Sequence, residues 1–412
     1  MNSIIKETQT NKHLHIAEWL FIALFAYYYI LPSANYSIPF LLMVGAGLLY
    51  LAYIMFFCSS PDNIIMTVVK VMAVILFISM CYYLFTVTMT VSSSVDNYEL
   101  KRFISKFQQL FFTMFPLALI YRLLKFGSKN QKMTMFVFCA VLIVYVIIQS
   151  VLELSVNETA SRVWGEFNSM SEKNVGTYNF VYAVAASLPA TFTLAFNAKK
   201  IVYRVLFFIY LVLGLVFLVM AQYTISLLIT VLLCFFGVFL ATKRGTIRFL
   251  IALICPIFII FLPNIIQWFA DSFVGGSMRT RLYEVASYFT GEKMGYNLGG
   301  RFKLYKGTID AFMASPLIGA SGLKFDGHAT FLTVLADIGI VGGIPFYWLY
   351  FAAGGYVKKL LNDKLMSSFF LLTFLSVILT GLLNPIHAAI PLPMVSWFVV
   401  PLMIDLFINR EE

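Results

Sequence analysis

The sequence predicts an all-α integral membrane protein that crosses the bilayer about twelve times. Of its 412 residues, 61% are hydrophobic and only 12% are charged, and the mean hydropathy is +0.87. A water-soluble protein needs more charge on its surface than this composition supplies. Apolar runs of about 20 residues, the length that spans a bilayer, recur along the whole chain. We expect one polytopic membrane domain over residues 1–412, with membrane lipids around it and no nucleic-acid partner.

The apolar runs define the expected spans in chain order. They are 18–31, 38–57, 64–91, 103–121, 133–152, 175–196, 201–220, 222–241, 247–269, a tenth beginning near 329, 365–383 and 389–408. In the tenth span, Gly339 and Gly343 form a GxxxG pattern, which predicts that another helix packs closely there. The five cysteines lie in or beside apolar runs without a CxxC pair, so neither a disulfide framework nor a zinc site is expected.

The basic residues give the expected orientation, because Lys and Arg gather in the cytoplasmic loops of membrane proteins. With the N-terminus in the cytoplasm, every short basic loop except the one around Asp62 falls on the cytoplasmic side. These residues are Arg122, Lys125, Lys129, Lys132, Lys199, Lys200, Arg204, Lys243, Arg244, Arg248, Lys358, Lys359, Lys364 and Arg410. Both termini are therefore expected in the cytoplasm, and the polar start MNSIIKETQTNKHLH is expected to be a retained tail.

Two loops on the opposite face carry basic residues where this rule disfavours them. The loop 153–174 contains Arg162 and Lys173, and the much longer loop 271–328 contains seven Lys and Arg residues. Within the longer loop, RLYEVASYF and RFKLYKGTIDAFM show helical apolar spacing with basic residues between. We expect short amphipathic helices at or just above the outer membrane surface.

Basic residues on this face indicate an anionic ligand. Arginine presents a planar fork that fits phosphate oxygens, and it keeps its charge at every physiological pH. At a membrane surface, lipid head groups and lipid-linked diphosphates are the available anions. An alternative for Arg279, Arg281, Lys303 and Lys306 is that they anchor interfacial helices to lipid phosphates.

Three stretches of the outer loops carry a family pattern. They are RVWGEFNSMSEKNVGTYNF (162–180), with Arg162, Asn174 and Gly176; GGRFKLYKGTIDAFMASPLIGASG (299–322), with Arg301, Tyr305, Pro316, Gly319 and Gly322; and HATFLTVLADIG, with His328 and Gly339. In their order and spacing, these stretches resemble the O-antigen ligase and Wzy-type polymerase superfamily. The resemblance covers residues 162–182 and 299–345. It departs from the family at Ala329, where members often have Asn.

The resemblance implies a GT-C-like fold and a glycosyltransferase that moves a glycan from undecaprenyl diphosphate to a sugar hydroxyl. Arg162 and Arg301 would hold the donor diphosphate, with Arg279 or Arg281 assisting by electrostatic stabilisation. His328 would be the base that activates the acceptor hydroxyl, with Asp326 as the rival base. An alternative for His328 is an interfacial residue close to a helix N-terminus.

Further implications concern the substrate, partners and location. Asn174, Tyr305 and Asp326 would contact substrate, and the absence of a DxD motif favours metal-independent chemistry without a cofactor. The expected location is a bacterial cytoplasmic membrane, with the site on the periplasmic or extracellular face. A flippase and a chain-length regulator are candidate protein partners. Alternative functions are an O-antigen ligase with lipid A core as acceptor, and a polysaccharide transporter or flippase.

Overall fold

The computed structural model describes residue 14, 16–57, isolated positions between 66 and 81, 113–161, 167–242, 260–272 except 262, 276–290, 296–320, 328–386 except 362, and 389–408. All regular elements in these ranges are helices, and one isolated antiparallel bridge joins Ala198 to Ile408. The predicted all-α class is therefore confirmed for the described part of the chain. Two predicted site residues, Arg162 and Asp326, lie outside the described residues. So do most of the predicted spans 64–91 and 247–269 and the first half of 103–121.

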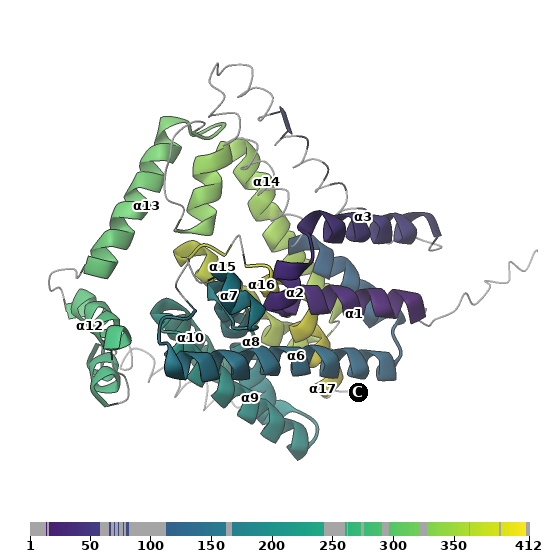
Figure 1. Ribbon diagram of the computed structural model, residues 1–412, viewed down its shortest axis with the longest axis horizontal. Coiled ribbons are helices and arrows are strands. Elements are labelled where there is room, and N and C mark those ends of the chain that lie inside the picture. Colours follow the sequence, from purple (N-terminus) through teal and green to yellow (C-terminus); the bar gives the residue numbers. More distant parts are fainter. Residues whose placement is uncertain are drawn as a thin grey trace, which may run out of the picture.

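The helices follow the apolar runs closely (Figure 1). The predicted span 201–220 is α9, and the predicted span 365–383 is α15, which begins one residue earlier. The helices are α1 (Ile16–Ile30), α2 (Pro32–Ser37), α3 (Phe40–Phe57), α6 (Lys129–Val156), α7 (Phe167–Glu172), α8 (Tyr178–Asn197), α9 (Ile201–Met220), α10 (Thr224–Ala241), α12 (Gly276–Thr290), α13 (Tyr296–Ala314), α14 (Thr330–Leu360), α15 (Lys364–Leu383), α16 (Pro391–Met394) and α17 (Val400–Phe407). A π-helical turn, Val395–Val399, joins α16 to α17, and residues 113–126 are also helical.

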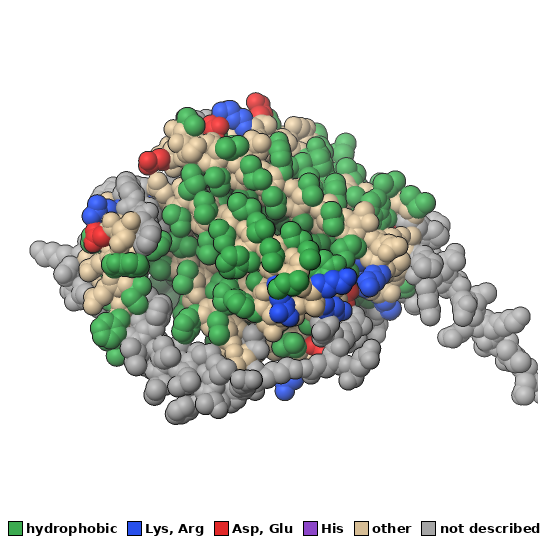
Figure 2. All heavy atoms as spheres, turned by 90° about the horizontal axis from the view of Figure 1, so that it is seen from below, with side chains coloured by type: hydrophobic (Ala, Val, Ile, Leu, Met, Phe, Trp, Pro, Cys, Tyr) green, Lys and Arg blue, Asp and Glu red, His purple; other side chains and the backbone are tan. Residues whose placement is uncertain are grey.

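Five of these helices, α6, α8, α9, α14 and α15, are long and apolar enough to cross a membrane. The protein is therefore an integral membrane protein with several candidate spans. The exposed surface of α9 agrees with this assignment. Large apolar side chains along it, such as Ile201, Leu206 and Phe208, are more than half exposed. Figure 2 shows the face of the molecule on which α9 lies: hydrophobic side chains cover most of it, and Lys and Arg gather toward one end.

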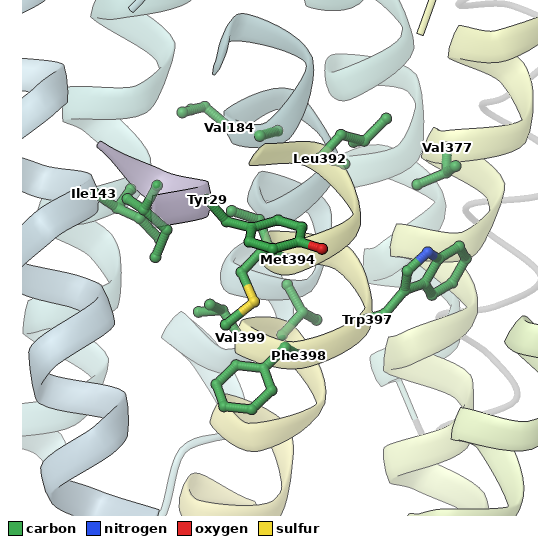
Figure 3. Packing of buried hydrophobic residues seen from close by; sticks show 14 of the residues in the cluster. Tyr29, Ile143, Val184, Val377, Leu392, Met394, Trp397, Phe398 and Val399 are labelled. Carbon is green, nitrogen blue, oxygen red and sulfur yellow. The ribbon is translucent and has the colours of Figure 1, made fainter. Parts of the chain in front are cut away.

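Helix α8 lies at the centre of the helix bundle. It packs against α9, α10, α15 and α16, and nearly all of its side chains from Phe180 to Leu194 are buried. Its run of small residues, AVAASLPA, lets neighbouring helices approach closely. The C-terminal segment fills the space beside it, and Figure 3 shows Met394 and Phe398 among residues of α1, α6 and α8.

The short basic connections meet at one end of the bundle, which we call the basic end. Lys132 pairs with Asp405 at 3.0 Å, and the backbone N–H of Lys199 donates to the carbonyl of Phe407. At the same end, Gln131 donates to the carbonyl of Leu14, one turn before the buried Glu18–Arg122 ion pair. The connections around Lys132 and Lys199 therefore lie at one end, as predicted, whereas Lys243, Arg244, Arg248 and Arg410 lie outside the described residues. The assignment of this end to the cytoplasm stays a prediction.

The long outer loop contains helices at both predicted positions. RLYEVASYF lies within α12 and RFKLYKGTIDAFM lies within α13. Both helices lie at one side of the molecule, at the left of Figure 1, away from the C-terminus. Helix α12 contacts α10 and α13, and α13 packs along α14, so these helices hold the loop against the bundle.

Helix α14 is not the single regular helix that the sequence predicts. Gly339 has φ +61° and ψ −166°, which interrupts the helix, and the turn 316–320 lies against the break. The N–H of Ile340 donates to the carbonyl of Pro316, and the N–H of Ala320 donates to the carbonyl of Ala336. A Cβ on Gly339 would lie 2.3 Å from the backbone of Leu317. The prediction that a helix packs against Gly339 is therefore wrong, because a backbone turn occupies that position.

Candidate functional site

Asn384, at the end of α15, joins three segments that are distant in sequence. Its carboxamide oxygen accepts a hydrogen bond from Nη1 of Arg301 on α13 at 3.2 Å. Its backbone carbonyl accepts from both the N–H and the hydroxyl of Thr330, the first residue of α14. The hydroxyl of Tyr305, one turn after Arg301, donates to the neighbouring carbonyl of Leu383 at 2.8 Å. The structure thus places Arg301 and Tyr305, both predicted site residues, at the junction of α13, α14 and α15.

Arg281 on α12 lies near the same junction and contacts the turn between α9 and α10. Its Nη1 donates to the carbonyl of Gln222 at 3.4 Å, and Gln222 occupies the left-handed region with φ 58°. Burial lowers the pKa of Arg281, and the nearby positive charge of Arg301 lowers this pKa further. Arg281 and Arg301 are therefore close enough to repel each other.

Tyrosine rings pack beside the two arginines. Tyr182 on α8 makes an edge-to-face contact with Tyr223 at 5.9 Å between ring centroids, and a second contact with Tyr178 at 6.2 Å. Tyr182 also lies within electrostatic range of Arg301 and Tyr305. We call the group of Arg281, Arg301, Tyr182, Tyr223, Tyr305 and Asn384 the arginine–tyrosine cluster.

The partners of the two guanidinium groups are neutral. Within the ranges that the structure describes, Arg301 donates to an amide oxygen and Arg281 to a backbone carbonyl, and neither forms an ion pair with a carboxylate. Both side chains are half-buried. The carboxylate of Glu284, one turn further along α12, lies within electrostatic range of Arg281 but forms no direct ion pair with it. Two partly desolvated positive charges without a directly bonded carboxylate make a site that favours an anion.

The remaining predicted site residues fall into two groups. His328 is partly exposed and precedes Thr330 by two residues, so its backbone lies next to the Asn384 junction. Arg162 and Asp326 lie outside the described residues. The residue before Arg162 is described: the carbonyl of Ser161 accepts a hydrogen bond from the hydroxyl of Tyr223 at 3.4 Å. The loop 153–174 therefore reaches the cluster at Ser161.

Arg279 and Asn174 have other partners. Arg279 forms an exposed ion pair with Asp271 at 2.6 Å and lies over the ring of Tyr283. Asn174, in the left-handed region with φ 58°, accepts a hydrogen bond from the N–H of Ser33 in the first turn of α2. Neither residue belongs to the arginine–tyrosine cluster, and their contacts with substrate stay predictions.

Sequence reasoning missed three members of the cluster: Asn384, Tyr182 and Tyr223. Asn384 is 3% exposed and its Nδ2 is buried without a hydrogen-bond partner in the described part of the chain, which leaves its two N–H donors for a ligand. The available signal was the pair Asn384–Pro385, directly after the predicted span 365–383. Such a pair ends a helix and leaves a polar side chain inside the protein. Nothing in the local sequence separates Tyr182 or Tyr223 from the other 21 tyrosines among the 23 of the chain.

Within the described ranges, no three side chains of His, Cys, Asp or Glu lie close enough together to hold a metal ion. Metal-independent chemistry stays a prediction. No family model matches the sequence, and no curated protein is similar to it.

Proposed function

We propose that the protein is a polymerase of lipid-linked oligosaccharide repeat units, a glycosyltransferase of the Wzy type. It transfers a glycan from undecaprenyl diphosphate to a hydroxyl of an acceptor repeat unit, in the synthesis of O-antigen, capsule or exopolysaccharide. The observation that carries the proposal is the pair of half-buried guanidinium groups, Arg281 and Arg301, bonded only to neutral partners at the end of the bundle opposite the basic end.

The diphosphate of the donor binds at Arg281 and Arg301. An anion between these groups removes their mutual repulsion, which is the second cause of the lowered pKa of Arg281. Arg162 follows Ser161 in the sequence and is proposed as a third guanidinium for the diphosphate. The diphosphate leaves with an extra negative charge, and positive groups already in place stabilise that charge as it develops.

The acceptor hydroxyl requires a base, and His328 supplies it. Its neutral imidazole takes the proton from the hydroxyl, whose oxygen attacks the anomeric carbon of the donor sugar. The bond from that carbon to the phosphate oxygen breaks, and its electron pair leaves on undecaprenyl diphosphate. No acid is needed for departure, because a diphosphate is a good leaving group.

The positions of the charged groups support the orientation of this site. The cluster lies at the start of α8 and the basic end follows the end of α8, so the positive-inside rule supports a periplasmic or extracellular position for the cluster. Both termini would then be cytoplasmic. A transporter would instead need charged groups along a path at mid-membrane depth, and Arg281 and Arg301 lie on helices outside the five candidate spans.

The test is synthesis by the purified protein in detergent from a synthetic undecaprenyl-diphosphate-linked repeat unit, with products separated on a gel. We expect a ladder from the native chain, and a loss of rate of about 100-fold or more from Arg301→Gln or Arg281→Gln. Arg204→Gln is the matched control, because Arg204 also donates to a backbone carbonyl, that of Ala198, but at the basic end.

The same assay includes His328→Ala and His328→Gln. A normal ladder from Arg301→Gln and His328→Ala at matched protein levels would remove the catalytic assignment. A native chain that gives no product without a membrane potential would favour the transporter.

A further inference from the structure

A cavity lined by polar and aromatic side chains lies between α2, α7, the start of α8 and α16. Its volume is about 240 Å³. Figure 1 shows α2, α7 and α16 close together, and α2 packs against α7 while α16 packs against α8. The residues that line this cavity are Tyr29, Pro32, Asn35, Tyr36, Ser171, Thr177, Asn179, Phe180, Ile390 and Pro391.

Local sequence fixes the walls of this cavity. Pro32 suits the first turn of α2, where its missing N–H has no helical partner to lose. Asn174, with its left-handed backbone, turns the chain out of α7 and binds the N–H of Ser33 through its side chain. The N–H of Gly176 donates to the hydroxyl of Ser150 on α6 at 2.7 Å. The two walls that carry the polar groups are therefore connected by hydrogen bonds.

The lining is uncharged. Among the described residues that line it there is no Asp, Glu, Lys, Arg or His, and the lining combines aromatic rings, hydroxyls and carboxamides. This combination suits a sugar ring, whose C–H faces pack on aromatic side chains while its hydroxyls both donate and accept hydrogen bonds. An anion such as a diphosphate would find no compensating charge here. The volume is below the roughly 300–1,000 Å³ of pockets for drug-sized ligands, so it accommodates a single ring.

One polar atom in the lining has an unused hydrogen-bonding capacity. Oδ1 of Asn179 is buried and has no hydrogen-bond partner in the described part of the chain. A buried acceptor without a donor is unfavourable by about 1–3 kcal/mol, and a ligand hydroxyl would satisfy it. Ser171 and Thr177, both buried, supply hydroxyls in the same cavity.

The cavity and the cluster share two pieces of structure. On α8, Asn179 and Phe180 line the cavity while Tyr178 and Tyr182 form the aromatic contacts beside the arginines. The segment that leaves Asn384 reaches the cavity at Ile390 and Pro391. The cavity and the cluster are therefore both built on the first two turns of α8.

We propose that this cavity is a subsite for an uncharged sugar ring of the acceptor repeat unit. The role in the acceptor rests on the proposed polymerase function, whereas the binding of a neutral sugar does not. The subsite holds the ring through its hydroxyls and its apolar face, while the arginines of the cluster hold the donor.

The test measures binding without catalysis. Saturation-transfer NMR on the purified protein in detergent uses methyl glycosides of glucose, galactose, N-acetylglucosamine and N-acetylgalactosamine as neutral probes, and methyl glucuronide as the acidic probe. We expect at least one neutral probe to bind and the acidic probe to bind at least about tenfold more weakly, because nothing in the lining offsets its charge. Failure of all neutral probes, or tighter binding of methyl glucuronide, overturns the proposal.

Variants locate the binding. Asn179→Leu should weaken binding of the best neutral probe about tenfold or more, as expected for loss of a buried hydrogen bond and of room in the cavity. Asn197→Leu is the matched control, because Asn197 lies at the other end of α8 and donates to the carbonyl of Thr193. Ser171→Ala is a smaller change that leaves the fold intact if Asn179→Leu does not purify. Equal binding by Asn179→Leu, Ser171→Ala and the control overturns the proposal.

The two proposals fail separately. If neutral probes do not bind but Arg301→Gln abolishes the ladder, the subsite is wrong and the polymerase stands. If Asn179→Leu alone loses the probe but Arg301→Gln makes a normal ladder, the subsite stands and the polymerase is wrong. When both hold, Asn179→Leu should raise the KM for the acceptor about tenfold and leave the KM for the donor within about twofold.

Discussion

Arginines at the two ends of the bundle have opposite surroundings. At the basic end, Arg122 donates to both carboxylate oxygens of Glu18, at 2.6 and 2.9 Å, and Tyr50 donates to the same carboxylate. Both members of this pair are buried, with exposed fractions of 8% for Arg122 and 4% for Glu18. At the other end, Arg281 and Arg301 are half-buried and donate only to neutral oxygens.

The difference separates a structural arginine from one that is available to a ligand. The charge of Arg122 is fully compensated within the protein, so adding an anion there would displace Glu18. The charges of Arg281 and Arg301 repel each other and are bonded directly to no carboxylate, with only Glu284 in electrostatic range of Arg281, so the site can accept an anion. A count of basic residues cannot make this distinction, because it depends on what each guanidinium contacts.

The largest expected effect is on the compensated pair. Glu18→Gln leaves the buried guanidinium of Arg122 without its counter-charge and should lower the free energy of unfolding by about 3–5 kcal/mol. Titration with a denaturing detergent, followed by tryptophan fluorescence, measures the loss. Adding Arg122→Met should recover much of it, because no charge then remains buried. By contrast, Arg301→Gln should leave the stability of the ligand-free protein unchanged or raise it. Equal losses from Glu18→Gln and Arg301→Gln would remove the distinction between the two ends.

A diphosphate ligand should stabilise the protein through the arginine–tyrosine cluster. Undecaprenyl diphosphate at about 100 times its Kd should raise the stability by about 2.7 kcal/mol, and a thermal shift in detergent detects this. Arg301→Gln and Arg281→Gln should remove most of the shift, whereas Arg204→Gln should keep it. Undecaprenol without phosphate is the control ligand and should give no shift.

Gly319→Ala should disturb the cluster end selectively. Gly319 has φ +88°, and a Cβ there would lie 2.2 Å from the carbonyl oxygen of Asp337. The left-handed backbone alone costs a residue with a side chain about 1–3 kcal/mol, and the overlap must push α13 away from α14. Transfer activity of Gly319→Ala should fall. The loss of stability caused by Glu18→Gln should be the same in the native chain and in the Gly319→Ala variant. Gly307→Ala on α13 is the control, because its Cβ would meet nothing within 4 Å.

The smallest effect concerns Arg279, which is paired but exposed. Hydrogen bonds from Tyr283 and Arg279 lower the pKa of Asp271 below its ordinary value. A lowered folded-state pKa means that the contribution to stability is present above the ordinary value of about 3.9 and is lost as the pH falls through the folded-state pKa. Asp271→Asn should therefore lower the unfolding midpoint slightly at pH 7, and the difference should shrink in acid. A difference that grows in acid would contradict the direction of the shift.

Much of the fold follows from local sequence. The bounds of α6, α8, α9, α10 and α15 lie within a few residues of the predicted spans, because hydropathy and length decide where a helix can cross a bilayer. The amphipathic helices α12 and α13 were predictable from the same periodicity. The interruption of α14 was not, since it depends on the turn 316–320, whose backbone supplies hydrogen-bond partners at Gly339 from another part of the chain.

The candidate site was predictable in part, for a comparable reason. Arg281 and Arg301 are detectable because they lie in a loop where positive charge is unexpected. Asn384 is not, because its role comes from contacts with α13 and α14 that no local pattern records. The cavity around Asn179 is likewise built from four distant segments, so no single motif contains it.

The junction of Gly319 and Gly339 has a consequence for how related sequences should diverge. Its contacts run from main chain to main chain, so side chains at Leu317, Ile318 and Ile340 can drift without altering them. Positions 319 and 339 cannot be substituted in this way, because a Cβ at either position would collide with the backbone of the facing segment. Distant relatives should therefore keep this pair of glycines, some twenty residues apart, after most other likeness has faded.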